Sequence, residues 1–323
     1  MSDNSHIEWT DATWNPITGC TIVSAGCTNC YAMGLAGSRL KHHPSRAGLT
    51  RETGGRHVWT GEVRLNEQWL DQPLRWRKPR MIFVCAHGDL FHESVPDAWI
   101  DRVFAVMALC PQHTFQVLTK RPERMRAWRA ENRITYIMAA AEAEIDRLGW
   151  DSWPASTRAW EAHIDGFPNV WLGTSIEDQP TADARIPHLL ATPAAVRFVS
   201  AEPLLGPVDL TNIADGWDAL DDGADDGIPA EPIPDWIIVG GESGPGARPM
   251  HPDWARSLRD QCSGAGVAFF FKQWGGWAPA SVVIPHAHLP ESADQMIHAV
   301  KKLTGRSLDG RTWDELPVGR PTQ

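Results

Sequence analysis

Residues 81–92 read MIFVCAHGDLFH, an apolar run followed directly by polar side chains that include Asp89. A short, continuous apolar run of this kind is typical of a strand that is buried on both faces. Residues 96–109 then repeat apolar side chains at helical spacing. A buried strand with a polar end and a following helix is the unit of parallel α/β sheets, so this stretch predicts such a sheet.

The same unit recurs along the chain, and polar residues follow each apolar run. A short strand is expected at 14–17, and the remaining apolar runs lie at 115–118, 170–173, 196–199, 236–239 and 267–271. Parallel strands bring their carboxyl ends to one edge of a sheet, where βα barrels and doubly wound sheets both place their sites. Because so many consecutive strands have polar ends, we expect an α/β fold that forms a partial (β/α) barrel with insertions.

Three stretches interrupt this repeat. Residues 42–80 lack a clear strand, residues 130–167 read as a helical insertion rich in Ala and Glu, and residues 211–234 read as an acidic surface loop. We expect residues 1–300 to form the partial barrel with an N-terminal iron–sulfur loop. Residues 301–323 are then a C-terminal extension that packs on the barrel or trails it.

The composition of the chain excludes some classes of protein. The chain has 323 residues and a net charge of −10, which argues against a generally basic nucleic-acid binder. Basic residues nevertheless crowd the stretch from Arg39 to Arg80, where they form either a phosphate-binding face or an ordinary solvated surface. No apolar run reaches membrane-spanning length and no signal peptide is evident, so we expect a cytoplasmic protein without membrane contact.

The chain contains 17 Trp, and Trp59, Trp69 and Trp76 alternate with arginines in the basic stretch. Such interleaving can stack nucleobases, although cation–π packing within the fold gives the same pattern. Nucleic acid or a modified nucleotide is therefore the expected substrate class.

Cys20, Cys27 and Cys30 share one loop with the spacing C-x6-C-x2-C. Three thiolates on one loop can hold three irons of a [4Fe–4S] cluster and leave the fourth iron open. An open iron is what a radical enzyme needs to bind S-adenosylmethionine (SAM). A zinc site with His6 as fourth ligand and a disulfide that leaves one thiol unpaired are the alternatives.

Four motifs together resemble one known family. They are IEWTDATWNP at 7–16, CYA at 30–32, GGESG at 240–244 and LDGRTW at 308–313. The chain is similar to a phage-associated, radical SAM-like family of unassigned function. The resemblance implies a partial (β/α) barrel of the radical SAM type, a three-Cys cluster, SAM as cofactor and a separate three-Cys-motif partner protein.

Site roles follow from this resemblance and from strand-end position. Asp89 is expected to bind the methionine amine of SAM, and Lys120 or Arg121 its carboxylate. Ser175 and Glu177 are expected to bind the ribose; helix capping is the alternative for Asp89 and Ser175. Gly240, Gly241 and Glu242 offer a turn for an adenine or phosphate edge. Glu202 and Lys272 end later strands and are the expected catalytic residues.

The sequence thus predicts a radical SAM-type enzyme that generates a 5′-deoxyadenosyl radical and acts on nucleic acid or a modified nucleotide. The competing hypothesis is a non-catalytic iron–sulfur or zinc protein that binds DNA or a partner protein.

Overall fold

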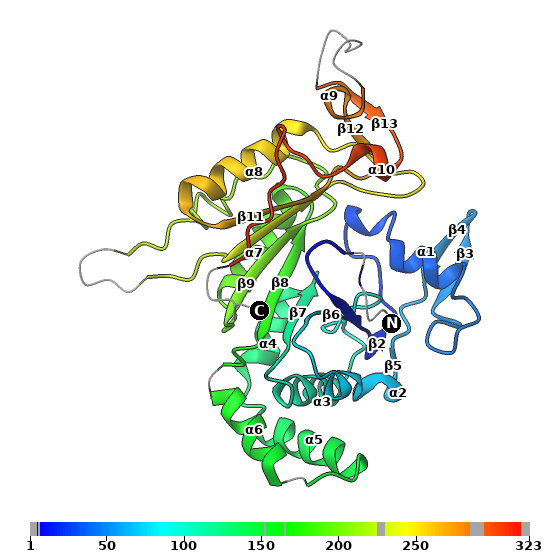
Figure 1. The fold of residues 1–323 in the computed structure, drawn as a ribbon, viewed down its shortest axis with the longest axis vertical. Coiled ribbons are helices and arrows are strands. Elements are labelled where there is room, and N and C mark those ends of the chain that lie inside the picture. The colour runs from blue at the N-terminus through cyan, green and yellow to red at the C-terminus, as the bar shows by residue number, and fades with distance from the viewer. Residues whose placement is uncertain are drawn as a thin grey trace.

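Seven parallel strands form one sheet in the computed structural model, which describes residues 5, 7–151, 153–164, 166–224, 230–284 and 294–317 (Figure 1). The order of the strands in the sheet is their order in the chain. They are β1 (Ala12–Trp14), β6 (Met81–Val84), β7 (Thr114–Thr119), β8 (Val170–Ile176), β9 (Val196–Ala201), β10 (Trp236–Gly240) and β11 (Ala268–Gln273).

Every neighbouring pair in this sheet is parallel. The sheet begins at β1, ends at β11 and curls into half a barrel, so the expected partial barrel with seven strands is confirmed. Its first strand is Ala12–Trp14 and not 14–17 as expected. The strands were predictable because their side chains are almost all buried; β8, for example, has no exposed residue along its length.

Helices follow the strands and cover one face of the sheet. They are α3 (Asp97–Ala108), α4 (Pro122–Ala130), α7 (Gln179–Leu190) and α8 (Pro252–Ala265). Alternate strand residues, among them Val84, Val117, Leu172, Val199 and Val239, pack with these helices in the main hydrophobic core. The predicted helical insertion is also confirmed: α5 (Ile134–Arg147) and α6 (Trp153–Ile164) pack together beside α3 (Figure 1).

The other face of the sheet is filled by aromatic side chains near the amino ends of the strands. Met81, Trp171, Phe198, Trp236 and Phe270 form this second core together with Trp9. The ring centroid of Trp9 lies 4.9 Å from that of Phe83 and 6.3 Å from that of Trp236. This packing fills the amino end of the half-barrel and leaves room at the carboxyl end.

Residues 42–80 contain strands that the sequence did not reveal. A hairpin joins β3 (Thr50–Thr53) to β4 (Arg56–Trp59), and β2 (Ile17–Thr18) pairs with β5 (Arg64–Leu65). The expectation of no clear strand was wrong because the hairpin lies on the surface and its strands are mostly polar. Its turn consists of Gly54 and Gly55, both with positive φ, as a tight two-residue hairpin requires.

The remaining N-terminal elements are α1 (Tyr31–Gly37), α2 (Glu67–Leu70) and two 3-10 turns, η1 (Ala25–Cys27) and η2 (Gln72–Arg75). Within the described part of the acidic stretch 211–234 there is no helix or strand before β10, in line with the expected loop. No helix among the described residues is long and apolar enough to cross a membrane.

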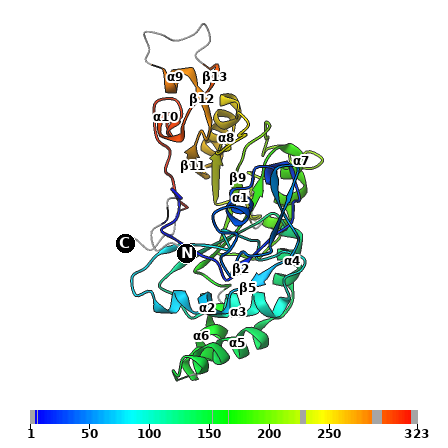
Figure 2. The same ribbon diagram turned by 90° about the vertical axis from the view of Figure 1, so that its right-hand side faces the viewer.

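The C-terminal part packs against the last strand of the sheet. β12 (Trp277–Pro279), α9 (Ala280–Val283), β13 (Met296–His298) and α10 (Lys301–Thr304) form a projection beside α8 (Figure 2). The chain then returns along β11, where Phe271 N donates to Trp313 O at 2.9 Å and Glu315 N donates to Phe269 O at 3.2 Å. The extension therefore covers the free edge of β11.

Gly173 of β8 makes room for the second core, because a Cβ at this position would lie 2.6 Å from the ring of Phe198. We expect Gly173→Ala to lower the free energy of unfolding by about 1–3 kcal/mol through overpacking. Urea denaturation measures this change. The loss of stability caused by Gly173→Ala should be smaller when Phe198 is also replaced by Leu, because the aromatic ring that the added Cβ would meet is then absent.

Gly264 is the matched control. It lies exposed in α8 with no atom within 4 Å of an added Cβ. Gly264→Ala should therefore stabilise the protein by about 0.5–1 kcal/mol. Equal effects of the two substitutions would contradict the packing argument.

Candidate functional site

A cavity of about 510 Å³ lies at the carboxyl end of the half-barrel. This volume falls within the range of small-molecule sites. The cavity wall brings together most of the residues that the sequence singled out: Cys20, Cys27, Cys30, Asp89, Lys120, Ser175, Glu202, Gly241, Glu242 and Lys272. The alternation of side chains along the strands explains this, because Lys120, Ser175, Ser200 and Lys272 continue the face that carries the aromatic core.

The three cysteines come from one short loop with local order. Cys27 ends η1, where its N–H donates to Ser24 O at 3.0 Å, and Cys30 N donates to Cys27 O at 3.3 Å. Cys30 immediately precedes α1. The loop can follow this path because Gly19, at φ +97°, approaches Glu62 O so closely that a Cβ would lie 2.1 Å away.

Burial keeps two of these thiols protonated in the absence of a metal. It raises the pKa of Cys20 to about 12, with the nearby Asp89 carboxylate adding to the effect, and it also raises the pKa of Cys30. Among the described residues, no group of three His, Cys, Asp or Glu side chains is arranged to hold a metal ion. His6, considered as a zinc ligand, lies outside the described residues.

Asp89 is a bridge between the sheet and Arg121 rather than a free carboxylate. Its Oδ1 accepts from Phe91 N at 2.9 Å and Thr119 Oγ1 at 2.7 Å. Its Oδ2 accepts from Lys120 N at 3.2 Å and Arg121 Nη1 at 2.9 Å. Protein donors thus occupy the acceptor sites of this carboxylate. Its expected role in binding the amine of SAM stays a prediction.

Arg121, which is paired with Asp89, also contacts the cysteine loop. Its guanidinium donates to Thr21 Oγ1 at 2.6 Å and to Cys20 Sγ at 3.7 Å. The Arg121 side chain is only 5% exposed and is also paired with Glu93 at 2.7 Å. Asp89 and Arg121 therefore fix the start of the cysteine loop and place a positive charge beside one thiol.

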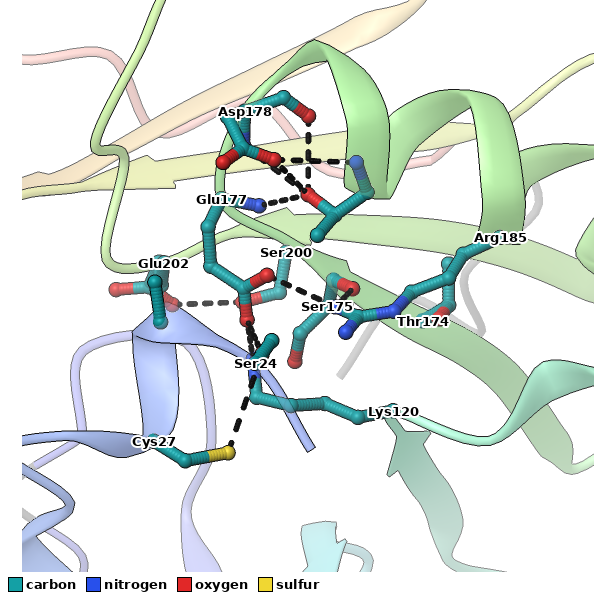
Figure 3. A network of polar contacts seen from close by, with 12 residues as sticks. Ser24, Cys27, Lys120, Thr174, Ser175, Glu177, Asp178, Arg185, Ser200 and Glu202 are labelled. Atoms are coloured by element: carbon teal, nitrogen blue, oxygen red, sulfur yellow. Dashed lines mark hydrogen bonds and ion pairs between the residues drawn. The ribbon is translucent and has the colours of Figure 1, made fainter. Parts of the chain in front are cut away.

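Glu177 is a second such bridge, and it is completely buried (Figure 3). Its Oε1 accepts from Ser24 Oγ at 2.9 Å and pairs with Lys120 Nζ, while its Oε2 pairs with Arg185 at 3.0 Å. A Cβ at Gly26 would lie 2.4 Å from Oε1, so the cysteine loop rests directly on this carboxylate. Glu177 supports the cavity from behind, which differs from the expected contact with a ribose.

Glu242 bridges the other side of the loop. Its Oε2 accepts from Asn29 Nδ2 and from Arg248 Nε, each at 2.9 Å. Arg248 also donates to Ala25 O at 3.0 Å, which links the turn after β10 to the cysteine loop. Gly241 permits this turn, because a Cβ there would lie 2.0 Å from Trp274 O.

Glu202 and Lys272 form an ion pair of 2.9 Å on the cavity wall. The side chains are 13% and 19% exposed, and Ser200 Oγ donates to Glu202 Oε2 at 3.0 Å. Gly240 stands behind Glu202, since a Cβ at this position would lie 2.5 Å from Oε1. The two side chains thus place an anion and a cation next to one another on the cavity wall.

Sequence reasoning missed Cys85, Arg185 and Arg248. Cys85 lies inside an apolar run and is 97% buried, yet it also lines the cavity and has a positive φ of 57°. Arg185 lies inside α7 and Arg248 follows a turn, so neither has the strand-end position that revealed the other residues. The capping alternative for Ser175 was wrong, because the N-cap of α7 is Asp178, which forms a capping box with Thr181.

The fold and the cavity define an α/β half-barrel protein with a cysteine-lined pocket. The family model described as "Protein of unknown function (DUF5131)" matches residues 4–317, so the chain belongs to the DUF5131 family. Neither the curated proteins nor the solved structures contain a match.

The burial of Glu177 leads to a test of stability. In Glu177→Gln, Lys120 and Arg185 lose their shared buried anion, so we expect the free energy of unfolding to fall by about 3–5 kcal/mol. Ser24→Ala removes one hydrogen bond to this carboxylate but neither of its cations, and should cost less, about 1.5–3 kcal/mol. Chemical denaturation of the metal-free protein measures both. A Gln variant as stable as the parent protein would show that the carboxylate is not needed for the loop.

Proposed function

We propose that the chain is an iron–sulfur enzyme of the radical SAM type, with Cys20, Cys27 and Cys30 as the cluster ligands. The observation that carries this proposal is that the three loop cysteines line the same cavity as the Glu202–Lys272 pair. A cluster on this loop would therefore sit next to a charged small-molecule site at the mouth of a partial barrel. The proposal places the protein in the reducing cytoplasm, where free thiols and such clusters persist.

The chemistry of the donor set suits an iron–sulfur cluster, although no three His, Cys, Asp or Glu side chains among the described residues are gathered around one metal position. Thiolates are the usual ligands of iron–sulfur clusters, and one loop supplies three of them. The guanidinium of Arg121, 3.7 Å from Cys20 Sγ, and the ammonium of Lys120 would offset the negative charge that thiolate ligation introduces. Ser24 Oγ, 3.9 Å from Cys27 Sγ, adds a hydrogen-bonding group beside a second ligand.

The charges on the cavity wall suit an amino-acid moiety. Glu202 and Lys272 face the cavity as an anion and a cation, which complement the amine and the carboxylate of a methionine group. When bound, the cluster and SAM supply one-electron chemistry that removes a hydrogen atom from a substrate. The chain would position these groups, and Trp9 and Phe83 of the aromatic face line part of the cavity.

A second candidate is a non-catalytic iron–sulfur or zinc protein. The observation that favours it is that Asp89, Glu177 and Glu242 are all bound to protein donors. In that case the charged network would only hold the cysteine loop in place. The two candidates differ in whether SAM reaches the cluster.

Iron content tests the ligand assignment. After anaerobic reconstitution, replacing any one of Cys20, Cys27 and Cys30 by Ala should abolish most of the bound iron. The matched control replaces Cys110 and Cys262, which are fully buried among apolar side chains, by Ala. If the control loses as much iron as the loop variants, the assignment fails.

SAM binding separates the two candidates. Saturating SAM should change the EPR spectrum of the dithionite-reduced cluster, and cleavage of SAM should release 5′-deoxyadenosine. Lys272→Ala should weaken SAM binding about 10- to 100-fold, because a charge-assisted hydrogen bond contributes about 1.5–3 kcal/mol. Lys78→Ala removes an exposed charge that precedes β6, at the opposite edge of the sheet, and serves as control. An EPR spectrum that SAM does not alter would reject the radical SAM enzyme and favour the non-catalytic iron–sulfur protein.

A further inference from the structure

The hairpin β3–β4 and the turn before it form an exposed cationic surface beside the cysteine loop. We call Arg39, Lys41, Arg51 and Arg56 the cationic hairpin surface; all four residues are exposed. Glu52 is the one acidic residue between positions 38 and 59. A protein with a net charge of −10 therefore carries a local positive patch at this place.

Among the described residues the four charged groups have no partner, and this distinguishes them from neighbouring arginines. Arg64 donates to Ala47 O at 2.9 Å and pairs with Glu62 at 3.0 Å, and Arg46 is buried above the ring of Trp69. Within the part of the chain that the structure describes, no hydrogen bond or ion pair reaches the charged ends of the cationic hairpin surface. These groups are therefore free to bind an external anion.

The hairpin is held firmly against the helix that follows the cysteines. Leu49 and Trp59 pack with Ala32, Met33 and Ala36 of α1 in a small hydrophobic core, against which Cys20 and Cys30 also pack. A Cβ at Gly37 would lie 2.1 Å from the ring of His57, so the hairpin and α1 are in direct contact. Trp59 also lines the cavity. Figure 1 shows β3 and β4 beside α1 at one side of the half-barrel.

We infer that the cationic hairpin surface binds the phosphate backbone of a nucleic-acid strand next to the cavity. Three of its four residues are arginines, whose guanidinium groups match the geometry of phosphate oxygens. A row of phosphates is the anion that an array of unpaired, exposed cations binds best. The inference deepens the proposed function by naming the substrate class, but the binding step itself does not need the cluster.

Fluorescence anisotropy tests this binding with a fluorescein-labelled 20-nucleotide single-stranded DNA, its duplex and the RNA of the same sequence. The variant Arg51→Ala/Arg56→Ala should bind the preferred strand at least 10-fold more weakly at 50 mM salt. Because each lost phosphate contact changes the salt slope by about 0.7 for single strands, the slope should fall by about 1.4.

The matched control is Arg77→Ala/Lys78→Ala. These two residues are also exposed and lie before β6, at the amino edge of the sheet and away from the cavity. The control should bind within about twofold of the parent protein. Arg51→Lys/Arg56→Lys keeps both charges and should retain most of the affinity, which separates lost charge from a misfolded hairpin.

Equal weakening in the hairpin variant and the control would overturn the inference, because the binding would then be diffuse. So would equal competition by polyglutamate of matched charge, which would indicate an acidic protein as the partner. Measurements on iron-free and iron-loaded protein separate the two proposals. If reconstitution loads no cluster while the iron-free protein still binds the strand, the proposed function is refuted and this inference stands. If the cluster loads but neither form binds the strand, this inference is refuted and the proposed function stands.

Discussion

The placement of the cysteine loop depends on one buried carboxylate. Glu177 has no exposed surface, and it contacts the loop through Ser24, the end of β7 through Lys120, and α7 through Arg185. A buried charge is tolerated only when partners compensate for the lost hydration, and here those partners come from three separate elements. The carboxylate therefore requires all three to be in place at once, which fixes the loop relative to the sheet.

Asp89 and Glu242 also hold the cysteine loop in place, each from a different side. Asp89 positions the loop through Arg121, and Glu242 positions it through Asn29 and Arg248. The three carboxylates lie after β6, β8 and β10, so the loop is attached around the rim of the half-barrel. The Glu202–Lys272 pair also lines the cavity, and the proposed chemistry rests on that pair and on the thiols.

The sheet could be predicted from the sequence because its strands are continuous apolar runs, as in β10, where Trp236 to Val239 are fully buried. The gathering of Asp89, Lys120, Ser175 and Glu202 followed from the parallel arrangement alone. Their roles did not, because a role depends on partners that are far away in the sequence. Arg248 reaches Ala25 across 223 positions, and no local pattern announces that contact. The β3–β4 hairpin was missed for a related reason: it lies outside the main cores, so it lacks an apolar run.

The cover on β11 has a consequence for how the chain is made. Residues 313–315 supply the hydrogen bonds along the outer side of this strand, and the indole of Trp236 donates to Glu315 O at 2.9 Å. These residues leave the ribosome after all seven strands, so the sheet can form before its last edge is protected. During that interval the unpaired edge of β11 is a template for intermolecular strand pairing. Nascent chains therefore pass through an aggregation-prone stage that ends only when the final segment docks.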